Sequence, residues 1–413
     1  MPHYALSPTY LFTPKGFLKG QTLIFDTTIL AFGPSEAIAQ EYPDAVVLPT
    51  PPYSILTPGF INLHVHLEFS SHTTQYKYGQ FLPWLYSVMA KRDELVGGCD
   101  TSCHKKALQS MLESGTTTIG AISSYGTELQ ACVDTPQRVL YFSELIGSNA
   151  AMVDALYGDF LARLNSAQKH NSSRFEAGIA IHSPYAVHPI LIQKALDIAQ
   201  KERLSVTAHL LESPAEYEWL TQGTGDFAPF FAKLLHQSAP LCTPQEFVAH
   251  FAQIPTLFTH ATQLDAPTLA LLSPQHHAIL HCPISNRLLG NGVLDIEALY
   301  EANIPYMCAT DGLSSNTTLD IRQELQSALF LHAHSHLPTL ALALLHSVTT
   351  TPSYHTPFNV GRIEVGMQAD MVLFALPEAI EHEEDIALHL ILQHYPIEAI
   401  FIDGQSTLWG KNN

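Results

Sequence analysis

Short apolar runs alternate with longer segments of helical spacing between residues 55 and 350 of this chain. The runs are apolar almost throughout, which is typical of strands that are buried on both faces. Eight runs follow one another: "SILTPGFINLHVH", "GTTTIGAIS", "RVLYFSELIG", "FEAGIAIHS", "LSVTAHLLES", "PTLFTHATQ", "HAILHCPISN" and "IPYMCATDG". Helical patterns such as "DTSCHKKALQSMLESG" and "PILIQKALDIAQKER" separate them. This alternation predicts an α/β fold, a (β/α)8 TIM-type barrel, over residues 55–358.

The two ends of the chain follow a different pattern. Residues 1–54 and 359–413 give short strands separated by turn residues, among them "QTLIFD" and "ADMVLFAL". Neither segment looks able to fold by itself, so we expect the two to pair as one small β-sandwich domain beside the barrel. Residues 214–250, with four prolines, indicate an insertion after the fifth strand, which we expect to lie over the barrel mouth as a lid.

Composition and charge limit the classes of partner that we expect for this protein. The formal net charge of −19 repels phosphate backbones and anionic lipid, so we expect no nucleic acid and no membrane as partner. No apolar run reaches the roughly 18 residues of a membrane-spanning helix, and the first residues lack the order of a signal peptide. The six cysteines show no CxxC spacing. We predict a cytoplasmic protein with reduced cysteines, which acts on a small molecule and could form a homodimer.

Polar side chains recur where the predicted strands end: His64, His66, His182, His209, Glu212, His260 and Asp311. The carboxyl ends of parallel barrel strands meet at one mouth. Because side chains of a strand alternate between its faces, His64 and His66 point the same way. Together with His209 and Asp311 they give an N/O set that suits a divalent metal and leaves a position for water. We predict one metal per chain, with Zn²⁺ as first choice and Fe²⁺ as alternative.

Several of these residues have a second interpretation. A lone His-x-His pair is common in packed cores, and His182 could simply bond the neighbouring loop. No lysine lies near His182 to bridge a second metal, which indicates a single ion. Glu68 is either a substrate contact, which we favour, or a partner for a histidine. The run "LFLHAHSHLPT" suggests another metal site, but we assign its histidines to a helix end and loop, because residues i and i+2 of a helix diverge.

These motifs resemble the amidohydrolase superfamily, and within it the mononuclear deaminases. The matching stretches span nearly the whole chain in the family's order: "PGFINLHVHLEF", "HLLES", "LFTHATQL", "LHCPISNRLL", "ATDGLSSNTTLDIRQEL" and "GRIEVGMQADMVLF". The resemblance implies a metal held by His64, His66, His209 and Asp311. It also implies that Glu212 shuttles a proton and that His260 steadies the attacking water. Asp311 would accept a proton as well.

The resemblance further implies hydrolytic deamination of an adenine-type nucleoside. The stretch "LEFSSHTTQYKY" departs from most such deaminases and is most similar to members whose nucleoside carries a benzoate group. An aromatic pocket with a cation would suit that group, and the loop from Tyr76 to Trp84 offers both, with Lys77 or Arg287 as the cation. We expect substrate contacts from Glu68, Trp84, His182, Ser285, Asn286 and Arg287.

The sequence is also compatible with other activities. Within the family, methylthioadenosine and adenosylhomocysteine are alternative nucleosides, and a chlorohydrolase or a guanine deaminase is an alternative activity. A glutamate in HxxE that can protonate a ring nitrogen favours deamination or dechlorination over amide opening. Outside the enzymes, a binding protein with a decayed barrel would have lost metal ligands, whereas this chain keeps every one.

Overall fold

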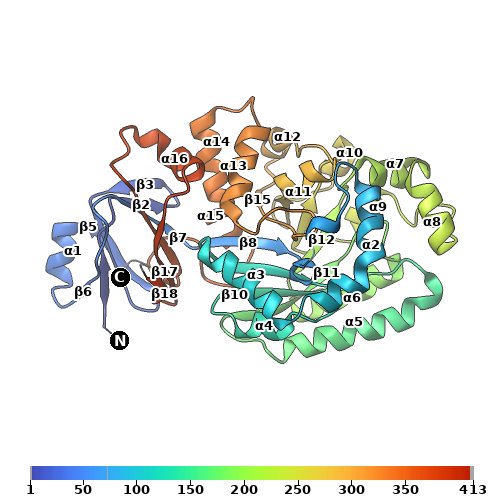
Figure 1. Ribbon diagram of the computed structural model, residues 1–413, viewed down its shortest axis with the longest axis horizontal. Helices are drawn as coiled ribbons and strands as arrows, with labels where there is room; N and C mark the ends of the chain where they lie inside the picture. Colours follow the sequence, from blue (N-terminus) through green and yellow to red (C-terminus); the bar gives the residue numbers. More distant parts are fainter. Residues whose placement is uncertain (1, 72, 410–413) are drawn as a thin grey trace.

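The structure is a computed structural model that describes residues 2–71 and 73–409. It has two parts (Figure 1): a barrel ringed by helices, and a group of strands in which the two ends of the chain lie side by side.

The barrel sheet holds eight parallel strands, which neighbour one another in sequence order from β8 to β15. They are β8 (Phe60–Val65), β9 (Thr116–Ser123), β10 (Arg138–Leu145), β11 (Phe175–Ile181), β12 (Val206–Leu210), β13 (Thr256–His260), β14 (His277–His281) and β15 (Tyr306–Cys308). The backbone N–H of Asp311, just beyond β15, donates to the carbonyl oxygen of His64 on β8 at 3.1 Å. This bond joins the last strand to the first, and the predicted (β/α)8 barrel is confirmed.

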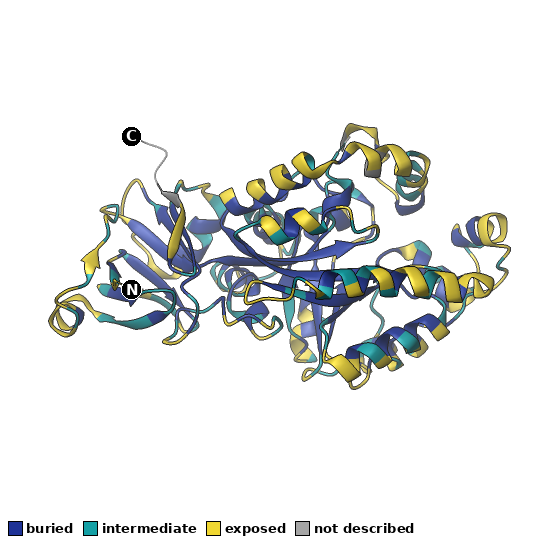
Figure 2. Cartoon of the chain, turned by 90° about the horizontal axis from the view of Figure 1, so that it is seen from below, coloured by how far each residue is buried: buried dark blue, intermediate teal, exposed yellow. Residues whose placement is uncertain are grey.

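Helices surround the strands, with buried residues toward the strands and exposed residues on their outer faces (Figure 2). They are α2 (Phe81–Gly98), α3 (Thr101–Glu113), α4 (Leu129–Asp134), α5 (Val153–Gln168), α6 (Pro189–Glu202), α7 (Pro214–Gln222), α8 (Phe227–Leu235), α9 (Pro244–Ala249), α10 (Ala266–Leu269), α11 (Pro283–Leu288), α12 (Ile296–Glu301), α13 (Ile321–Leu331), α14 (Leu337–Ser347) and α15 (Thr350–Ser353). Short 3-10 turns are η1 (Leu67–Phe69), η2 (Thr73–Gln75), η3 (Ala150–Met152) and η4 (Glu383–Asp385). Helices α7, α8 and α9 form the predicted insertion.

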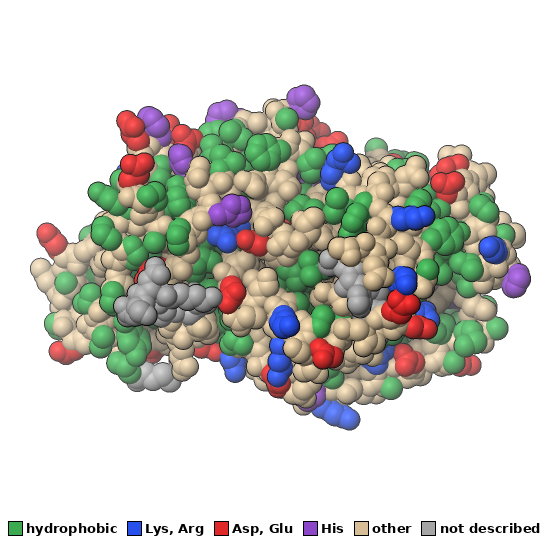
Figure 3. Space-filling view, viewed as in Figure 1, with side chains coloured by type: hydrophobic (Ala, Val, Ile, Leu, Met, Phe, Trp, Pro, Cys, Tyr) green, Lys and Arg blue, Asp and Glu red, His purple; other side chains and the backbone are tan. Residues whose placement is uncertain are grey.

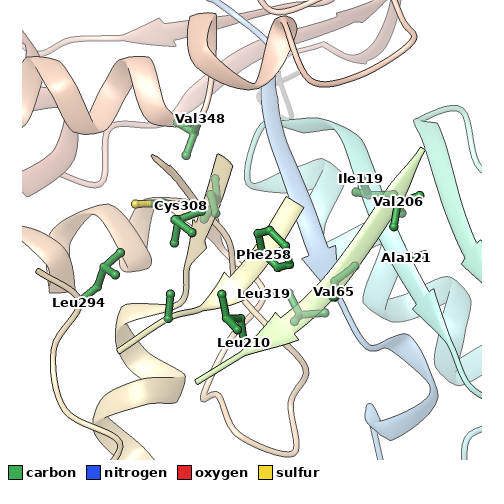
Figure 4. Packing of buried hydrophobic residues seen from close by; sticks show 14 of the residues in the cluster. Val65, Ile119, Ala121, Val206, Leu210, Phe258, Leu294, Cys308, Leu319 and Val348 are labelled. Carbon is green, nitrogen blue, oxygen red and sulfur yellow. The ribbon is translucent and has the colours of Figure 1, made fainter. Parts of the chain in front are cut away.

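Local sequence explains where these elements begin and pack. In α6, His188 caps the first turn by accepting from the N–H of Ile190, and Pro189 occupies the first helical position. Between strands and helices the packing is apolar, and Figure 4 shows Val65, Leu210 and Phe258 from three barrel strands in one cluster. The barrel is thus a filled core that holds the strand ends at fixed positions.

Strands from both ends of the chain build two further sheets. The first contains β2 (Tyr10–Thr13), β3 (Gly16–Lys19), β7 (Ser54–Pro58), β16 (Met371–Ala375), β17 (Ile397–Ile402) and β18 (Gln405–Trp409). The second contains β1 (Tyr4–Leu6), β4 (Gln21–Phe25), β5 (Ile29–Pro34) and β6 (Val46–Val47). Helices α1 (Ser35–Glu41) and α16 (Ile386–Leu392) accompany them. Apolar side chains of both sheets form one cluster, among them Leu23 and Leu373, while the exact domain limits stay a prediction.

The run expected as the first barrel strand is divided. Its first part, β7, pairs with β16 and β2 in the terminal sheet, and only β8 belongs to the barrel. Gly59 separates the two strands, and a Cβ added there would lie 2.1 Å from Oγ1 of Thr117. The lack of a side chain therefore lets the chain pass close to β9 as it changes sheet.

One expectation about the cysteines is wrong. Cys99, just after α2, and Cys103, in the first turn of α3, form a disulfide. Their Cα atoms lie 5.1 Å apart because the chain turns into α3 between them, a distance that a disulfide can bridge. The other four cysteines are free and buried: Cys132, Cys242, Cys282 and Cys308.

The surface carries mixed charge. Figure 3 shows Lys and Arg side chains dispersed among acidic ones on the face seen in Figure 1. In the part of the chain that the structure describes, every helix is too short or too polar to cross a bilayer.

Candidate active site

A cavity of about 680 Å³ opens at the carboxyl ends of the barrel strands. Its inner end is polar and is lined by His66, His182, His209, Glu212, His260 and Asp311. Its outer walls come from α2, η3, α5 and α8 and are largely apolar. Phe230 and Phe231 of the insertion line it, so the insertion lies at the mouth as expected, and its action as a lid stays a prediction.

Histidines of two strands and one aspartate converge at the inner end. The ring centres of His64 and His66 lie 4.9 Å apart, and the ring of His209 lies 5.0 Å from that of His64. The Nε2 atoms of His64 and His66 are both 3.7 Å from Oδ1 of Asp311. The structure thus brings together the four predicted ligands from β8, β12 and the end of β15.

Asp311 is held from several sides. Its Oδ2 accepts hydrogen bonds from Ser285 Oγ and Ser315 Oγ, both at 2.8 Å. Burial would raise the pKa of Asp311, but the nearby imidazoles of His64 and His66 outweigh burial and set that pKa well below the ordinary value. The side chain is therefore a fixed carboxylate, as a metal ligand must be.

The other imidazoles are fixed through one nitrogen each. Nδ1 of His209 bonds to the carbonyl oxygen of His182 at 2.6 Å, and Nδ1 of His260 to Oδ1 of Asn286 at 2.9 Å. Burial lowers the pKa of His66 and of His260 to about 4, so both rings are neutral near pH 7 and their lone pairs are free to bind a metal or accept a proton.

Backbone strain accompanies this arrangement. Leu211, His260 and Asp311, each at or beyond the end of a barrel strand, adopt positive φ values of 47°, 73° and 58°. Such left-handed conformations cost a non-glycine residue on the order of 1–3 kcal/mol, and they persist where the surrounding structure imposes them. Three of the strained residues thus lie at the ends of barrel strands, where precise aiming of side chains matters.

The residues present fit a divalent metal. Within the described part of the chain, Nε2 of His64 is buried and has no hydrogen-bond partner. An orphaned buried nitrogen that faces a carboxylate and further imidazoles indicates a position where a cation would bind, because buried polar atoms are nearly always paired. Three imidazoles and a carboxylate are a typical donor set for zinc.

Glu212, two residues past β12, lies beside this centre. Its Oε1 is 3.6 Å from Nε2 of His260 and accepts a hydrogen bond from Nδ2 of Asn291 at 3.2 Å. Burial, reinforced by the carboxylates of Asp311 and Glu216, raises the pKa of Glu212 well above its ordinary value. Glu212 therefore holds a proton more readily than an exposed glutamate does and can act as a general acid.

The expected substrate contacts divide into two groups. His182 and Trp84 line the cavity. Ser285 and Asn286 do not; they are buried behind it, where their side chains hold Asp311 and His260. The first turn of α11 directs them at Asp311 and His260, and a contact with substrate stays a prediction.

The structure also places Glu68 and Arg287 away from the expected substrate contacts. The carboxylate of Glu68 is buried and accepts the backbone N–H groups of Ser124, Tyr125 and Gly126, at 2.9, 2.6 and 3.1 Å. It therefore orders the loop after β9 instead of facing the substrate. Arg287 is exposed on α11 and does not line the cavity, and neither does Lys77.

Glu144 and Arg92 are among the cavity residues that the sequence did not predict. Glu144, the next-to-last residue of β10, is buried and lines the cavity, and Arg92 of α2 lines its mouth. A signal for Glu144 was present, since it is a charged residue near the carboxyl end of a predicted buried strand, like the histidines that were recognised. Arg92 had no such signal, because surface helices carry many cations.

Comparison with known proteins agrees with this geometry. The model of the amidohydrolase family matches residues 55–406. The chain is 44% identical to an aminodeoxyfutalosine deaminase of Nitratiruptor over 97% of its length and 98% of that protein. It is 29% identical to a protein of Helicobacter pylori named adenosine deaminase, over 95% of both chains.

Among solved structures, the fold matches Helicobacter pylori aminofutalosine deaminase in complex with methylthio-coformycin. That match has a TM-score of 0.92 and 27% identity, and it covers 99% of this chain and 100% of the other. Strand order, site geometry and near-complete coverage lead to one assignment: the chain belongs to the amidohydrolase family.

Proposed function

We propose that this chain is a metal-dependent deaminase that converts 6-amino-6-deoxyfutalosine to futalosine, a step of the futalosine route to menaquinone. The observation that carries the proposal is the buried carboxyl group of Glu212 beside the His/Asp centre, with Oε1 3.6 Å from Nε2 of His260, at the closed end of one cavity. The name of the Nitratiruptor relative supports the same substrate. The outer, apolar part of the cavity offers room for the benzoate half of that molecule.

The metal would be held by His64, His66, His209 and Asp311, with zinc as the proposed ion and Fe²⁺ as the alternative. When bound, such an ion supplies Lewis acidity that lowers the pKa of water from about 15.7 toward about 7. His260 holds the attacking water through Nε2, since Asn286 fixes its other nitrogen. Asp311 accepts the proton of that water. The water oxygen bonds to the carbon that carries the amino group while Glu212 protonates the adjacent ring nitrogen. Asp311 passes its proton to the amino group, the C–N bond breaks and ammonia leaves, and Glu212 takes up the proton of the new hydroxyl group.

The benzoate carboxylate needs a cation at the outer end. Arg163 lines the cavity, but its guanidinium already bonds to Asp159 and to the carbonyl oxygens of Ser123 and Glu144. Arg92 is more available, because its side chain is 58% exposed and, among the described residues, it forms one ion pair, in which Nε lies 3.4 Å from Oδ1 of Asp93. Its guanidinium also neighbours the hydroxyl of Tyr125. Arg92 therefore replaces Lys77 and Arg287 as the proposed partner of the carboxylate.

Kinetics on a substrate panel test the proposal. We expect kcat/KM, measured as ammonia release, to be higher for aminodeoxyfutalosine than for methylthioadenosine, adenosylhomocysteine or adenosine by at least about 10²-fold. Arg92→Leu should lower kcat/KM for aminodeoxyfutalosine alone. Arg287→Ala, at an exposed position, serves as control and should leave kcat/KM for all four substrates unchanged. A preference for adenosylhomocysteine would overturn the substrate assignment and leave the deaminase assignment standing.

A further inference from the structure

The carboxylate of Glu144 is incompletely paired although it is buried. Its Oε2 accepts a hydrogen bond from Ser124 Oγ at 2.5 Å. Its Oε1 has no partner in the described part of the chain, and the residue is 1% exposed. Leaving a buried acceptor unmatched costs about 1–3 kcal/mol, and more when the group is charged. An atom in that state inside a ligand cavity points to a donor that arrives with the ligand.

The position of Glu144 identifies the part of the ligand that it meets. Oxygen and nitrogen atoms of Glu144, His182 and His209 lie within 4.8 Å of one another, so Glu144 is one side chain away from the proposed metal site. On the outer side the cavity continues along Ile146 and Met152, which are apolar. A nucleoside with its base at the centre and an aromatic acid in the outer part has its sugar beside Glu144.

The chemistry of a carboxylate restricts the partner further. An ionised carboxylate only accepts hydrogen bonds, so the ligand must supply a donor there. In the middle of an adenine nucleoside the donors are the 2′- and 3′-hydroxyl groups of ribose. The backbone around Glu144 is also braced, because Arg163 donates to the carbonyl oxygens of Ser123 and Glu144, so the acceptor has a fixed place.

We propose that Glu144 accepts a hydrogen bond from a ribose hydroxyl and makes the enzyme selective for ribonucleosides over deoxynucleosides. The inference rests on the proposed function, because it takes the amino group of the base to react at the His/Asp centre. It adds a specificity-determining residue for the sugar, on a different strand from every predicted ligand.

The test compares adenosine with 2′-deoxyadenosine and 3′-deoxyadenosine on the metal-loaded wild type, on Glu144→Gln and on the exposed control Glu297→Gln. We expect wild type and control to prefer adenosine over at least one deoxynucleoside by about 10²-fold or more in kcat/KM. In Glu144→Gln, kcat/KM for adenosine should fall by most of this factor of about 10², while kcat/KM for the less favoured deoxynucleoside stays the same. Metal content, measured on each protein, should be equal.

Each other outcome has a distinct meaning. An active wild type without preference, or a Glu144→Gln variant that keeps the preference, overturns the inference alone. An equal loss for all three nucleosides together with lost metal also overturns it, and assigns Glu144 to the metal centre. A wild type that releases no ammonia from these nucleosides or from aminodeoxyfutalosine overturns the proposed function, and the inference with it.

Discussion

At the level of single residues, three side chains of the centre have one polar atom held by the protein and another left for chemistry. His209 and His260 are held through Nδ1, and Asp311 through Oδ2 by two serines. Such supporting bonds fix the tautomer and the orientation of the rings before a metal or substrate binds. The reorganisation needed during reaction is correspondingly small.

Glu212→Gln should keep the metal and lose activity. The amide has the size of the carboxyl group but no acidic proton to transfer, and general acid–base groups contribute about 10² to 10⁴-fold to the rate. We expect kcat to fall within that range and metal content to match the wild type. Turnover near the wild-type value would remove Glu212 from the mechanism.

His277 should make stability depend on pH. Burial lowers the pKa of His277 below 6.5, and its Nδ1 accepts the N–H of Ser273 at 3.0 Å. Protonation would break that bond. Because the folded pKa lies below the unfolded one, the unfolded chain binds the proton first, so the contribution is present above pH 6.5 and is lost as pH falls below it.

The measurement is urea unfolding at about pH 7.5 and about pH 5.5. The loss of stability between them should be smaller in His277→Gln than in the wild type. His394→Gln, at an exposed position, is the control and should keep the wild-type loss. Equal losses in all three proteins would contradict the argument.

The sequence predicted which residue types meet at the centre, but not what holds them. "CPISN" was recognised, yet its Ser285 and Asn286 were assigned to substrate. Which way these side chains point depends on how α11 leaves β14, and no residue pattern encodes that angle. Arg287, the next residue, points outward, so one helical step separates a buried support from an exposed cation.

At the scale of elements, the register of β8 against β9 places the first two histidines. That register shifts between Asn62 and Val65, the stretch that contains His64. Gly120 of β9 lies against it, and a Cβ added there would be 2.3 Å from the carbonyl oxygen of Leu63. The two backbones can approach this closely only because residue 120 has no side chain.

Gly120→Ala should therefore displace β8, lower the free energy of unfolding by about 1–3 kcal/mol and reduce bound metal. Gly158→Ala on α5 is the matched control, because a Cβ there meets nothing within 4 Å. In a helix that change should stabilise by about 0.5–1 kcal/mol. Calorimetry and metal analysis measure both effects, and a Gly120→Ala protein with wild-type metal content would contradict the role of this approach.

Periodicity could show that strands exist, but not which sheet each one joins. "SILTPGFINLHVH" is apolar from β7 through β8, so the pattern is the same on both sides of Gly59. The change of sheet follows from pairing with β16, more than 300 residues later in the chain. Contacts of that range leave no signal in a local window of sequence.

At the scale of the whole molecule, one buried ion pair ties the barrel to the terminal sheet. Nε of Arg138, on β10, donates to Oδ2 of Asp370 at 2.8 Å, and its Nη2 to Oδ1 at 3.1 Å. Asp403 bonds the same guanidinium. Both Arg138 and Asp370 are 2% exposed, so the pair is almost fully removed from water.

Arg138→Met should lower the free energy of unfolding by about 3–5 kcal/mol, because it leaves the carboxylate of Asp370 buried without its cation. Lys91→Met removes an exposed ion pair with Glu94 and should cost less than about 1 kcal/mol. Denaturant unfolding compares the two. Equal, small losses would mean that the buried pair does not hold the two parts together.

If this protein removes the amino group of aminodeoxyfutalosine by hydrolysis, the new oxygen on the purine comes from water. The most direct measurement is mass spectrometry of the product formed in water enriched in heavy oxygen, with ammonia counted in the same sample. We expect futalosine that carries one heavy oxygen on its purine, and one molecule of ammonia for each molecule of futalosine formed. Unlabelled futalosine, or free adenine from a broken glycosidic bond, would contradict it.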